Sequence, residues 1–185
     1  MLTGFGPYSN YENNISSEIV ESLEIASLNL NIKKLILPVS WHFSVKKYKE
    51  TLYNLSVPPD FVILLGIHPN RHYTIESHAL NFTFGKDIVK RIKFGLIRYK
   101  LNLRLQTTFN LGKLISFLGH KTRVKQSVFP GFYLCNYIYY WALLLSQEEY
   151  PVLFIHIPHK ELLSRGIDMI SKIIKIITLY YDQLV

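Results

Sequence analysis

Three apolar runs bounded by turn residues constrain the fold of this chain more than any other feature of its sequence. They are residues 33–38 (KKLILP), 60–66 (DFVILLG) and 152–158 (VLFIHIP). Short, nearly continuous apolar runs are typical of strands that are covered on both faces. We therefore predict a buried, mainly parallel sheet.

Segments with helical spacing of apolar residues alternate with these runs. They cover residues 14–28, 42–55, 111–118 and 164–179, together with the stretch after Cys135. This alternation predicts a three-layer α/β/α sandwich with a mainly parallel central sheet, and we expect residues 1–185 to form one domain. Such folds carry their chemistry at the carboxyl ends of the strands.

Two further segments are predicted as strands. They are residues 75–82 and residues 96–108, and the second alternates basic and apolar side chains (IRYKLNLRLQ) as an edge strand does. A strand here would place Arg98, Lys100, Asn102 and Arg104 on one face.

The net charge of +8 is concentrated in one segment. Residues 86–125 hold eleven Lys and Arg against one acid, Asp87, whereas the other 145 residues hold ten basic and twelve acidic groups. The main interpretation is a solvated strand whose charges block edge-to-edge aggregation. The alternative is that this segment binds a nucleic acid or an acidic partner. The segment has few aromatic residues to stack on bases and no recognised nucleic-acid motif, which argues against that alternative.

Cys135 is the single cysteine, which excludes an internal disulfide and a cysteine-rich zinc site and suits a reducing cytoplasm. The chain shows no secretory signal pattern. The uncharged stretch 127–147 is broken by Pro130, Gly131 and Asn136, so we expect a buried helix rather than a membrane span. Cys135 then lies at a helix N-terminus, where unpaired N–H groups and the helix dipole favour a thiolate.

Two other residues carry possible chemistry. His156 lies within the apolar run 152–158, and Glu76 lies within a mainly apolar segment (TIESHALNF). Such a histidine is usually a structural core residue. A glutamate in this setting is costly to bury unless a histidine or a hydrogen-bond donor pairs with it.

Taken together, four motifs resemble those of the pyroglutamyl peptidase I (pyrrolidone carboxyl peptidase) family. TGFGPYSN resembles its TGF-x-PFGG loop, and IESHALN its Glu-Arg-Val-Ala-Ile-Asn segment. SVFPGFYLCN resembles Ser-x-x-Ala-Gly-x-Tyr-x-Cys-Asn, and FIHIP resembles Phe-Ile-His-Val-Pro. The resemblance covers nearly the whole chain. It implies a cytoplasmic cysteine peptidase that removes N-terminal pyroglutamate from peptides.

The resemblance implies a triad in which Cys135 is the nucleophile, His156 the base and Glu76 the group that orients the imidazole. The oxyanion donors would be the main-chain N–H groups of Cys135 and Lys86. The pyroglutamyl ring would lie between two aromatic side chains, with a further contact from the strand that ends near residue 67. These substrate-binding positions are Phe5, Tyr8 and Ile67. The family implies no metal or organic cofactor and no membrane, and its members often form dimers or tetramers.

The sequence departs from the family pattern around this triad. Ser9 and Asn10 replace two glycines, Ile67 a glutamine, Ser77 an arginine, Pro130 an alanine and Tyr137 a histidine. These changes leave open a catalytically weak or silent homologue that binds a partner through the basic segment 86–125. A different cysteine acyl-transfer reaction, such as the hydrolysis of another amide or ester, is a third reading.

Overall fold

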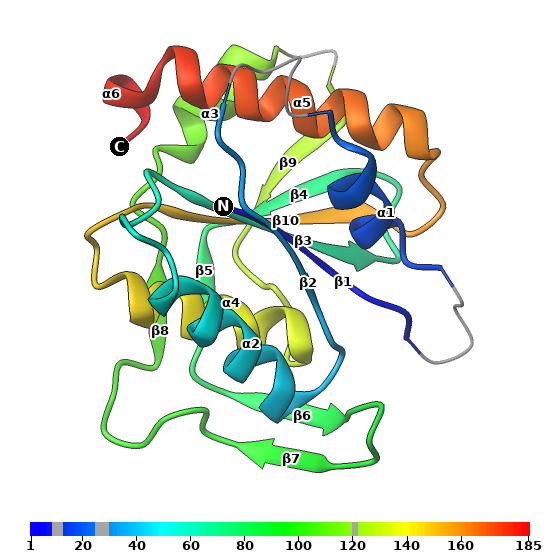
Figure 1. The fold of residues 1–185 in the computed structure, drawn as a ribbon, viewed down its shortest axis with the longest axis vertical. Coiled ribbons are helices and arrows are strands. Elements are labelled where there is room, and N and C mark those ends of the chain that lie inside the picture. The colour runs from blue at the N-terminus through cyan, green and yellow to red at the C-terminus, as the bar shows by residue number, and fades with distance from the viewer. Residues whose placement is uncertain (9–12, 25–29, 120–121) are drawn as a thin grey trace.

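The computed structural model describes residues 1–8, 13–24, 30–119 and 122–185. Its centre is a six-stranded sheet in the order β2-β1-β3-β10-β4-β9 (Figure 1). The strands are β1 (Leu2–Phe5), β2 (Lys34–Leu37), β3 (Val62–His68), β4 (Tyr73–Glu76), β9 (Val124–Ser127) and β10 (Val152–Pro158). β4 runs antiparallel to β10, and the other neighbouring strands are parallel.

Helices cover both faces of this sheet (Figure 1). One layer holds α1 (Ile15–Ser22), α3 (Leu111–Leu118), α5 (Leu163–Leu179) and α6 (Tyr181–Leu184), and the other holds α2 (Trp41–Tyr53) and α4 (Leu134–Ser146). The predicted α/β/α sandwich is confirmed.

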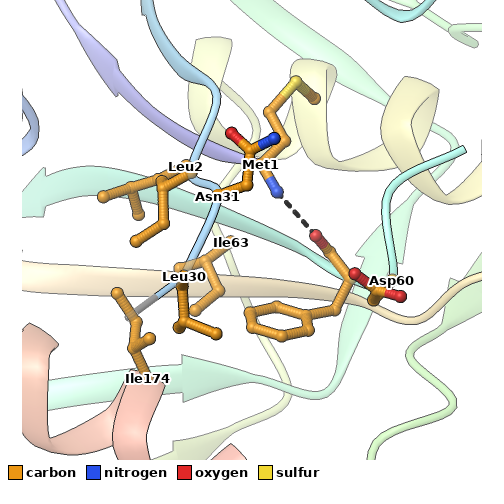
Figure 2. Close-up of a pocket in the computed structure, with 9 residues that line it drawn as sticks. Met1, Leu2, Leu30, Asn31, Asp60, Ile63 and Ile174 are labelled. Carbon is orange, nitrogen blue, oxygen red and sulfur yellow. Dashed lines mark hydrogen bonds between the residues drawn. The ribbon is translucent and has the colours of Figure 1, made fainter. Parts of the chain in front are cut away.

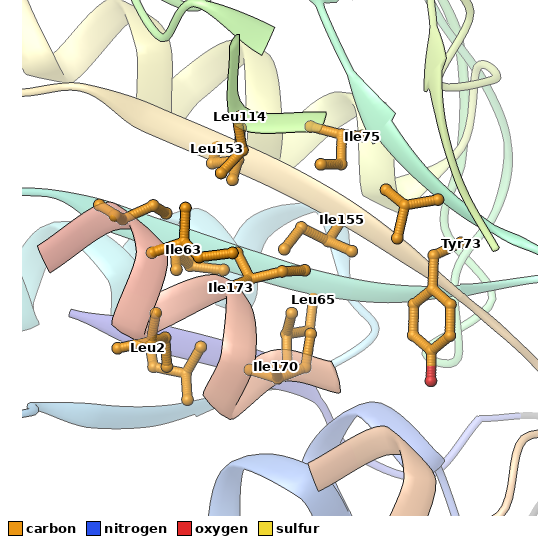
Figure 3. Packing of buried hydrophobic residues seen from close by; sticks show 14 of the residues in the cluster. Leu2, Ile63, Leu65, Tyr73, Ile75, Leu114, Leu153, Ile155, Ile170 and Ile173 are labelled. Atoms are coloured by element: carbon orange, nitrogen blue, oxygen red, sulfur yellow. The ribbon is translucent and has the colours of Figure 1, made fainter. Parts of the chain in front are cut away.

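Each helical layer shares a hydrophobic core with one face of the sheet. On one side, Ile63 and Ile155 of the sheet meet Leu114, Ile170 and Ile173 of the helices (Figure 3). The other core is rich in aromatic side chains and contains Trp41, Tyr48, Tyr139, Tyr140 and Phe154. Burial of these side chains from water is the main force that holds the three layers together.

The uncharged stretch 127–147 begins at the last residue of β9 and forms a loop and helix α4. Most of α4 is buried because the helix packs against β10 of the central sheet, against β5 and β8, and beside α2, which fits its apolar composition. Among the described residues, no helix has both the length and the hydropathy needed to cross a membrane.

The predicted strand over residues 96–108 is wrong. Only β8 (Arg104–Gln106) is extended there, and it pairs with β5 (His78–Leu80). The Asn81 side chain bonds the main chain of Arg98 and Leu101, and Lys100 has a left-handed φ of 61°, so the preceding segment folds into turns. Arg98, Lys100, Asn102 and Arg104 therefore do not form one face of a strand.

Two other boundaries differ from the prediction. Residues 75–82 do not form one strand, because β4 ends at Glu76 and β5 belongs to a different sheet. Ser77 lies at the break, where its N–H donates to the Ser127 oxygen and its own oxygen accepts from Thr107. α1 ends at Ser22, and residues 25–28 of the predicted helix, like Ser9 and Asn10, lie outside the described residues.

An antiparallel hairpin follows these strands. It consists of β6 (Thr83–Lys86), a turn and β7 (Ile92–Gly95), and it lies beside α2 and α4 (Figure 1). We call residues 83–95 the basic hairpin. The sequence patterns did not predict it.

Candidate active site

The candidate site is built around His156, near the carboxyl end of β10. The hydrophobic run of this strand is buried throughout, and the His156 side chain is only 3% exposed. Its register partner on the neighbouring strand β3 is Gly66. Because glycine has no side chain, the space beside His156 stays open.

Cys135 fills that space from helix α4. A Cβ atom built on Gly66 would lie 2.9 Å from the Cys135 Sγ atom, so the thiol lies directly over the glycine. Cys135 is the second residue of α4 and is half-buried. Its main-chain N–H belongs to the first turn, whose N–H groups have no partner within the helix. The predicted position at a helix N-terminus is confirmed.

Glu76 reaches His156 from the antiparallel strand β4. Its Oε1 atom lies 2.8 Å from the Nδ1 atom of His156 and accepts a second hydrogen bond, of 2.7 Å, from the Thr74 hydroxyl. Glu76 is 1% exposed, so the ion pair is shielded from solvent. Its Oε2 atom has no hydrogen-bond partner among the described residues, although the nearby Ser127 side chain favours the charged form.

The electrostatics of the pair favour a charged imidazole and a charged carboxylate. Burial alone lowers the pKa of His156, but hydrogen bonds to Cys135 and Glu76, together with their charges, raise it to about 9. Burial alone raises the pKa of Glu76, but the hydrogen bond to His156 and its charge hold that pKa below its usual value. With Nδ1 facing Glu76, Nε2 is the ring nitrogen left for Cys135. In this arrangement a proton can be transferred between the Cys135 thiol and the His156 imidazole.

A small pocket of about 90 Å³ lies beside the thiol. Its lining is mostly apolar and aromatic: Phe5, Tyr8, Asn14, Val39, Ile67, Tyr133, Leu134 and Cys135. All three predicted substrate-binding positions are thus in one cavity with the predicted nucleophile. Such a lining suits a small uncharged ring.

The loop after β1 is held in place by buried polar groups. Asn14 caps α1 by accepting from the Ser16 N–H, and its amide donates to the Gly6 oxygen. The Ser16 hydroxyl accepts from the Phe5 N–H at 3.0 Å. These bonds fix the backbone that presents Phe5 to the pocket.

Lys86, the predicted second oxyanion donor, lies at the end of β6. Its main-chain oxygen accepts a 2.8 Å hydrogen bond from the Tyr133 hydroxyl, two residues before Cys135. Tyr133 also lines the pocket. The structure therefore ties Lys86 to the start of the helix that carries the thiol.

A second pocket, of about 120 Å³, lies at the opposite end of the strands from Cys135. It is lined by residues at the amino ends of β1 and β3, where the Met1 amine donates to the Phe61 oxygen (Figure 2). Asp60 is its one acidic residue, and it contains no nucleophile or histidine. Nor does any group of three or more His, Cys, Asp or Glu suited to a metal occur among the described residues. Of these two pockets, the one at the carboxyl ends of the strands holds the candidate nucleophile Cys135.

The chain is similar to known proteins over most of its length. The family model described as pyroglutamyl peptidase matches residues 1–92. A pyrrolidone-carboxylate peptidase of Oceanobacillus iheyensis is 30% identical, and the match covers 90% of this chain and 88% of that protein. This chain belongs to the pyroglutamyl peptidase family.

Other members of the pyroglutamyl peptidase family are similar over most of their length. A pyrrolidone-carboxylate peptidase of Lactobacillus helveticus is 29% identical, with 86% of this chain and 82% of that protein covered. The crystal structure of pyrrolidone carboxyl peptidase from Fervidobacterium islandicum superposes with a TM-score of 0.85 at 24% identity and covers 100% of this chain and 98% of that chain. At this identity the structural match supports the fold.

Four residues around the site were not singled out from the sequence. Thr74 and Tyr139 bond Glu76, Gly66 makes room for the thiol, and Asp87 anchors the basic hairpin. Two of them had a usable signal. Thr74 lies two residues before Glu76 and hence on the same face of the strand, and Tyr139 lies one helical turn after Cys135. Gly66 and Asp87 depend on contacts between distant segments.

Proposed function

We propose that this chain hydrolyses the amide bond that follows an N-terminal pyroglutamyl residue, with Cys135 as nucleophile. The observation that carries the proposal is the buried pair of His156 and Glu76 beside a thiol that opens into a small apolar pocket. Membership of the pyroglutamyl peptidase family supports the same reaction.

The reaction would proceed in two steps. His156 takes the proton of Cys135, and the sulfur attacks the carbonyl carbon of the pyroglutamyl residue. When the tetrahedral intermediate collapses, the C–N bond breaks, the imidazolium protonates the leaving amine, and a thioester remains on Cys135. His156 then removes a proton from a water molecule, which attacks the thioester and releases pyroglutamate. Glu76 keeps the ring oriented and stabilises its charged form throughout.

The oxyanion of each tetrahedral intermediate needs fixed hydrogen-bond donors. The main-chain N–H of Cys135 is the first, since it belongs to the unpaired first turn of α4. We assign the second to the Lys86 N–H. The bond from the Tyr133 hydroxyl to the Lys86 oxygen supports this assignment, because it holds β6 against the start of the helix.

The lactam ring would occupy the pocket between Phe5, Tyr8 and Ile67. The ring is small and uncharged, so the free energy needed to remove it from water is low compared with that of a charged N-terminus. A free α-amino group in the same place would lie in a mostly apolar cavity with few groups to solvate it. The pocket thus favours pyroglutamate over proline, which has a ring of the same size but carries a charge.

The test uses fluorogenic amides of pyroglutamate, proline and N-acetylalanine. The wild-type chain should release the fluorophore from the pyroglutamyl amide and not from the prolyl amide, and Cys135→Ser should abolish the release while circular dichroism stays unchanged. Equal rates on pyroglutamyl and N-acetylalanyl amides would point to a general amide hydrolase instead. A folded wild type without activity on all three would overturn the proposal.

A silent binding protein that uses the basic segment 86–125 is the second candidate. The exposed cations of the basic hairpin favour it, whereas a binding function would not require the buried pair of His156 and Glu76. A salt titration of nucleic-acid binding separates the two functions, because contacts to phosphates weaken steeply as salt rises. Binding that is absent, or that does not depend on salt, would exclude a phosphate-tracking site.

A further inference from the structure

The basic hairpin is fixed rigidly beside the candidate active site. Asp87 is buried, and its carboxylate accepts hydrogen bonds from the Ser40 hydroxyl and from the N–H groups of Trp41 and Arg91. The Trp41 indole in turn donates to the Arg91 oxygen at 2.9 Å. Three of these bonds join the turn of the hairpin to the start of α2, and the fourth, between Arg91 and Asp87, closes the turn itself.

Strand β6 of the hairpin packs against the back of the pocket wall that Tyr133 forms. A Cβ atom on Gly85 would lie 2.7 Å from the Tyr133 ring, so the ring rests directly on the backbone of β6. The same ring contacts Tyr8, whose ring centroid is 5.8 Å away, and both tyrosines line the pocket. One side chain, Tyr133, therefore separates the pocket from the hairpin.

The hairpin carries four cations and no free acid. Lys86, Lys90, Arg91 and Lys93 lie within thirteen residues, and the one carboxylate there, Asp87, is occupied by the hydrogen bonds described above. Among the described parts of the chain, no ion pair joins any of these four cations to a carboxylate. Lys93 is half-buried, and its ammonium donates to the Tyr137 hydroxyl. The other three cations are exposed, and their summed positive potential is available to a ligand.

A group of exposed aromatic side chains, the aromatic ledge, accompanies these charges on the hairpin. Phe84 and Phe94 are register partners, are 58% and 78% exposed, and meet edge to face at 6.0 Å. Phe132, from the loop that leads to Cys135, continues the ledge, because its oxygen accepts from the Phe84 N–H and its ring meets Phe82. An apolar surface rimmed by charge is typical of a site that binds another molecule.

We propose that the basic hairpin binds the part of a substrate peptide beyond the pyroglutamyl residue and selects peptides with acidic residues there. This inference rests on the proposed function and names its substrate class. The cleaved peptide must leave the pocket next to a wall whose outer side is cationic, and acidic side chains at its second and third positions would lie within the hairpin's field. The aromatic ledge supplies apolar contact for their neighbours. A second copy of this chain fits the same face poorly, because two cationic faces repel each other.

The experiment compares three pyroglutamyl peptides of equal length. They differ only at the second and third positions after pyroglutamate. The acidic peptide has two acidic residues there, the amide peptide has the matching amides, and the lysine peptide has two lysines. At about 10 mM ionic strength we expect kcat/KM for the acidic peptide to exceed that for the amide peptide about 10-fold, with the lysine peptide slowest. At about 1 M salt, where the screening length is about 3 Å, the three values should converge.

Two variants locate the effect. Lys90→Asn/Arg91→Gln removes two hairpin charges, and asparagine suits the left-handed φ of 64° at residue 90. Lys113→Gln/Lys175→Gln removes two exposed charges from α3 and α5 in the opposite helical layer. The first should reduce kcat/KM for the acidic peptide severalfold more than kcat/KM for the amide peptide, and the second should alter neither value.

The outcomes separate this inference from the proposed function. Cleavage of all three peptides with equal kcat/KM at low salt would overturn the acidic preference and leave the peptidase function standing. A preference that persists in the hairpin variant would overturn the role of the hairpin. Equal cleavage combined with salt-sensitive inhibition by a short oligonucleotide would assign the hairpin to a nucleic acid instead. Failure to cleave any pyroglutamyl peptide would overturn both proposals.

Discussion

The Tyr139 hydroxyl donates a buried 2.8 Å hydrogen bond to the main-chain oxygen of Glu76. Tyr139 lies one turn after Cys135 on α4, so this bond joins the helix of the candidate nucleophile to the strand of the candidate carboxylate. It fixes the distance between two elements that are 63 residues apart in sequence. His156 lies between them and depends on both.

Tyr139→Phe should therefore loosen the site as well as the fold. The buried Glu76 oxygen would lose its partner, which should lower the free energy of unfolding by about 1–3 kcal/mol. Tyr140→Phe is the matched control, because it removes a 2.9 Å bond from the next residue of α4 to the Asn102 oxygen, away from Glu76. We expect only Tyr139→Phe to shift the alkaline limb of the pH–activity profile downward. Equal profiles for both variants would show a purely structural role.

The buried pair of His156 and Glu76 should make stability depend on pH in a defined window. The pKa of His156 is raised to about 9 in the fold, so its contribution is complete below about pH 6.5 and is lost as the pH rises to about 9. The pKa of Glu76 is lowered, so its contribution holds above its usual value and is lost as the pH falls below that value. The histidine contribution is on the order of 3 kcal/mol.

Urea unfolding at several pH values measures this dependence. The wild type should lose stability between pH 6.5 and 9, and Glu76→Gln, which keeps the shape of the side chain, should lose less over the same interval. The alkaline limb of activity should move toward lower pH in the same variant. A wild-type stability that stays flat across this interval would contradict a charged imidazole in the fold.

Gly66→Ala should remove activity without removing the catalytic groups. The new Cβ would lie 2.9 Å from the Cys135 Sγ and 2.8 Å from the Phe154 ring, closer than real contacts allow, so the thiol must move away from His156. We expect kcat/KM to fall by at least about 100-fold, since small displacements of reacting groups have effects of that size. Gly112→Ala on α3, whose nearest contact is 3.6 Å away, is the control. It should be slightly stabilising and fully active. Full activity of Gly66→Ala would show that the thiol does not depend on this space.

The hydrophobic patterns were sufficient to predict most of the central sheet and its helices. Runs such as 152–158 can be buried on both faces only in a covered sheet, and helix 111–118 matched its predicted bounds. The strand prediction for residues 96–108 failed because, among the described residues, only positions 104–106 of this segment pair with another strand. Asn81, fifteen residues earlier, instead binds its main chain. A side chain that satisfies a distant backbone leaves no local signal.

For the candidate site, too, one part could be predicted from the sequence and another could not. Cys135, His156 and Glu76 were found because their residue types and surrounding motifs resemble a known pattern. Their relative geometry could not be predicted from the sequence, because it depends on the register that places His156 beside Gly66 and on the antiparallel direction of β4. The basic hairpin shows the same limit. Its composition was evident, but only the buried contacts of Asp87 and Gly85 place it next to the pocket.

Ile67→Ala should widen the pocket and relax its selection of ring size. Ile67 is half-buried at the carboxyl end of β3 and lines the cavity with Phe5 and Tyr8. Its truncation removes apolar contact with the bound ring, so KM for a pyroglutamyl amide should rise more than kcat falls. A six-membered lactam should be accepted better, and the preference for the five-membered ring should drop about 10-fold, the effect of roughly one methylene in an apolar pocket. Ile115→Ala, a half-buried position on α3, is the control and should leave the preference unchanged. Kinetics on the two lactam amides measure both effects, and an unchanged preference in Ile67→Ala would place the ring elsewhere.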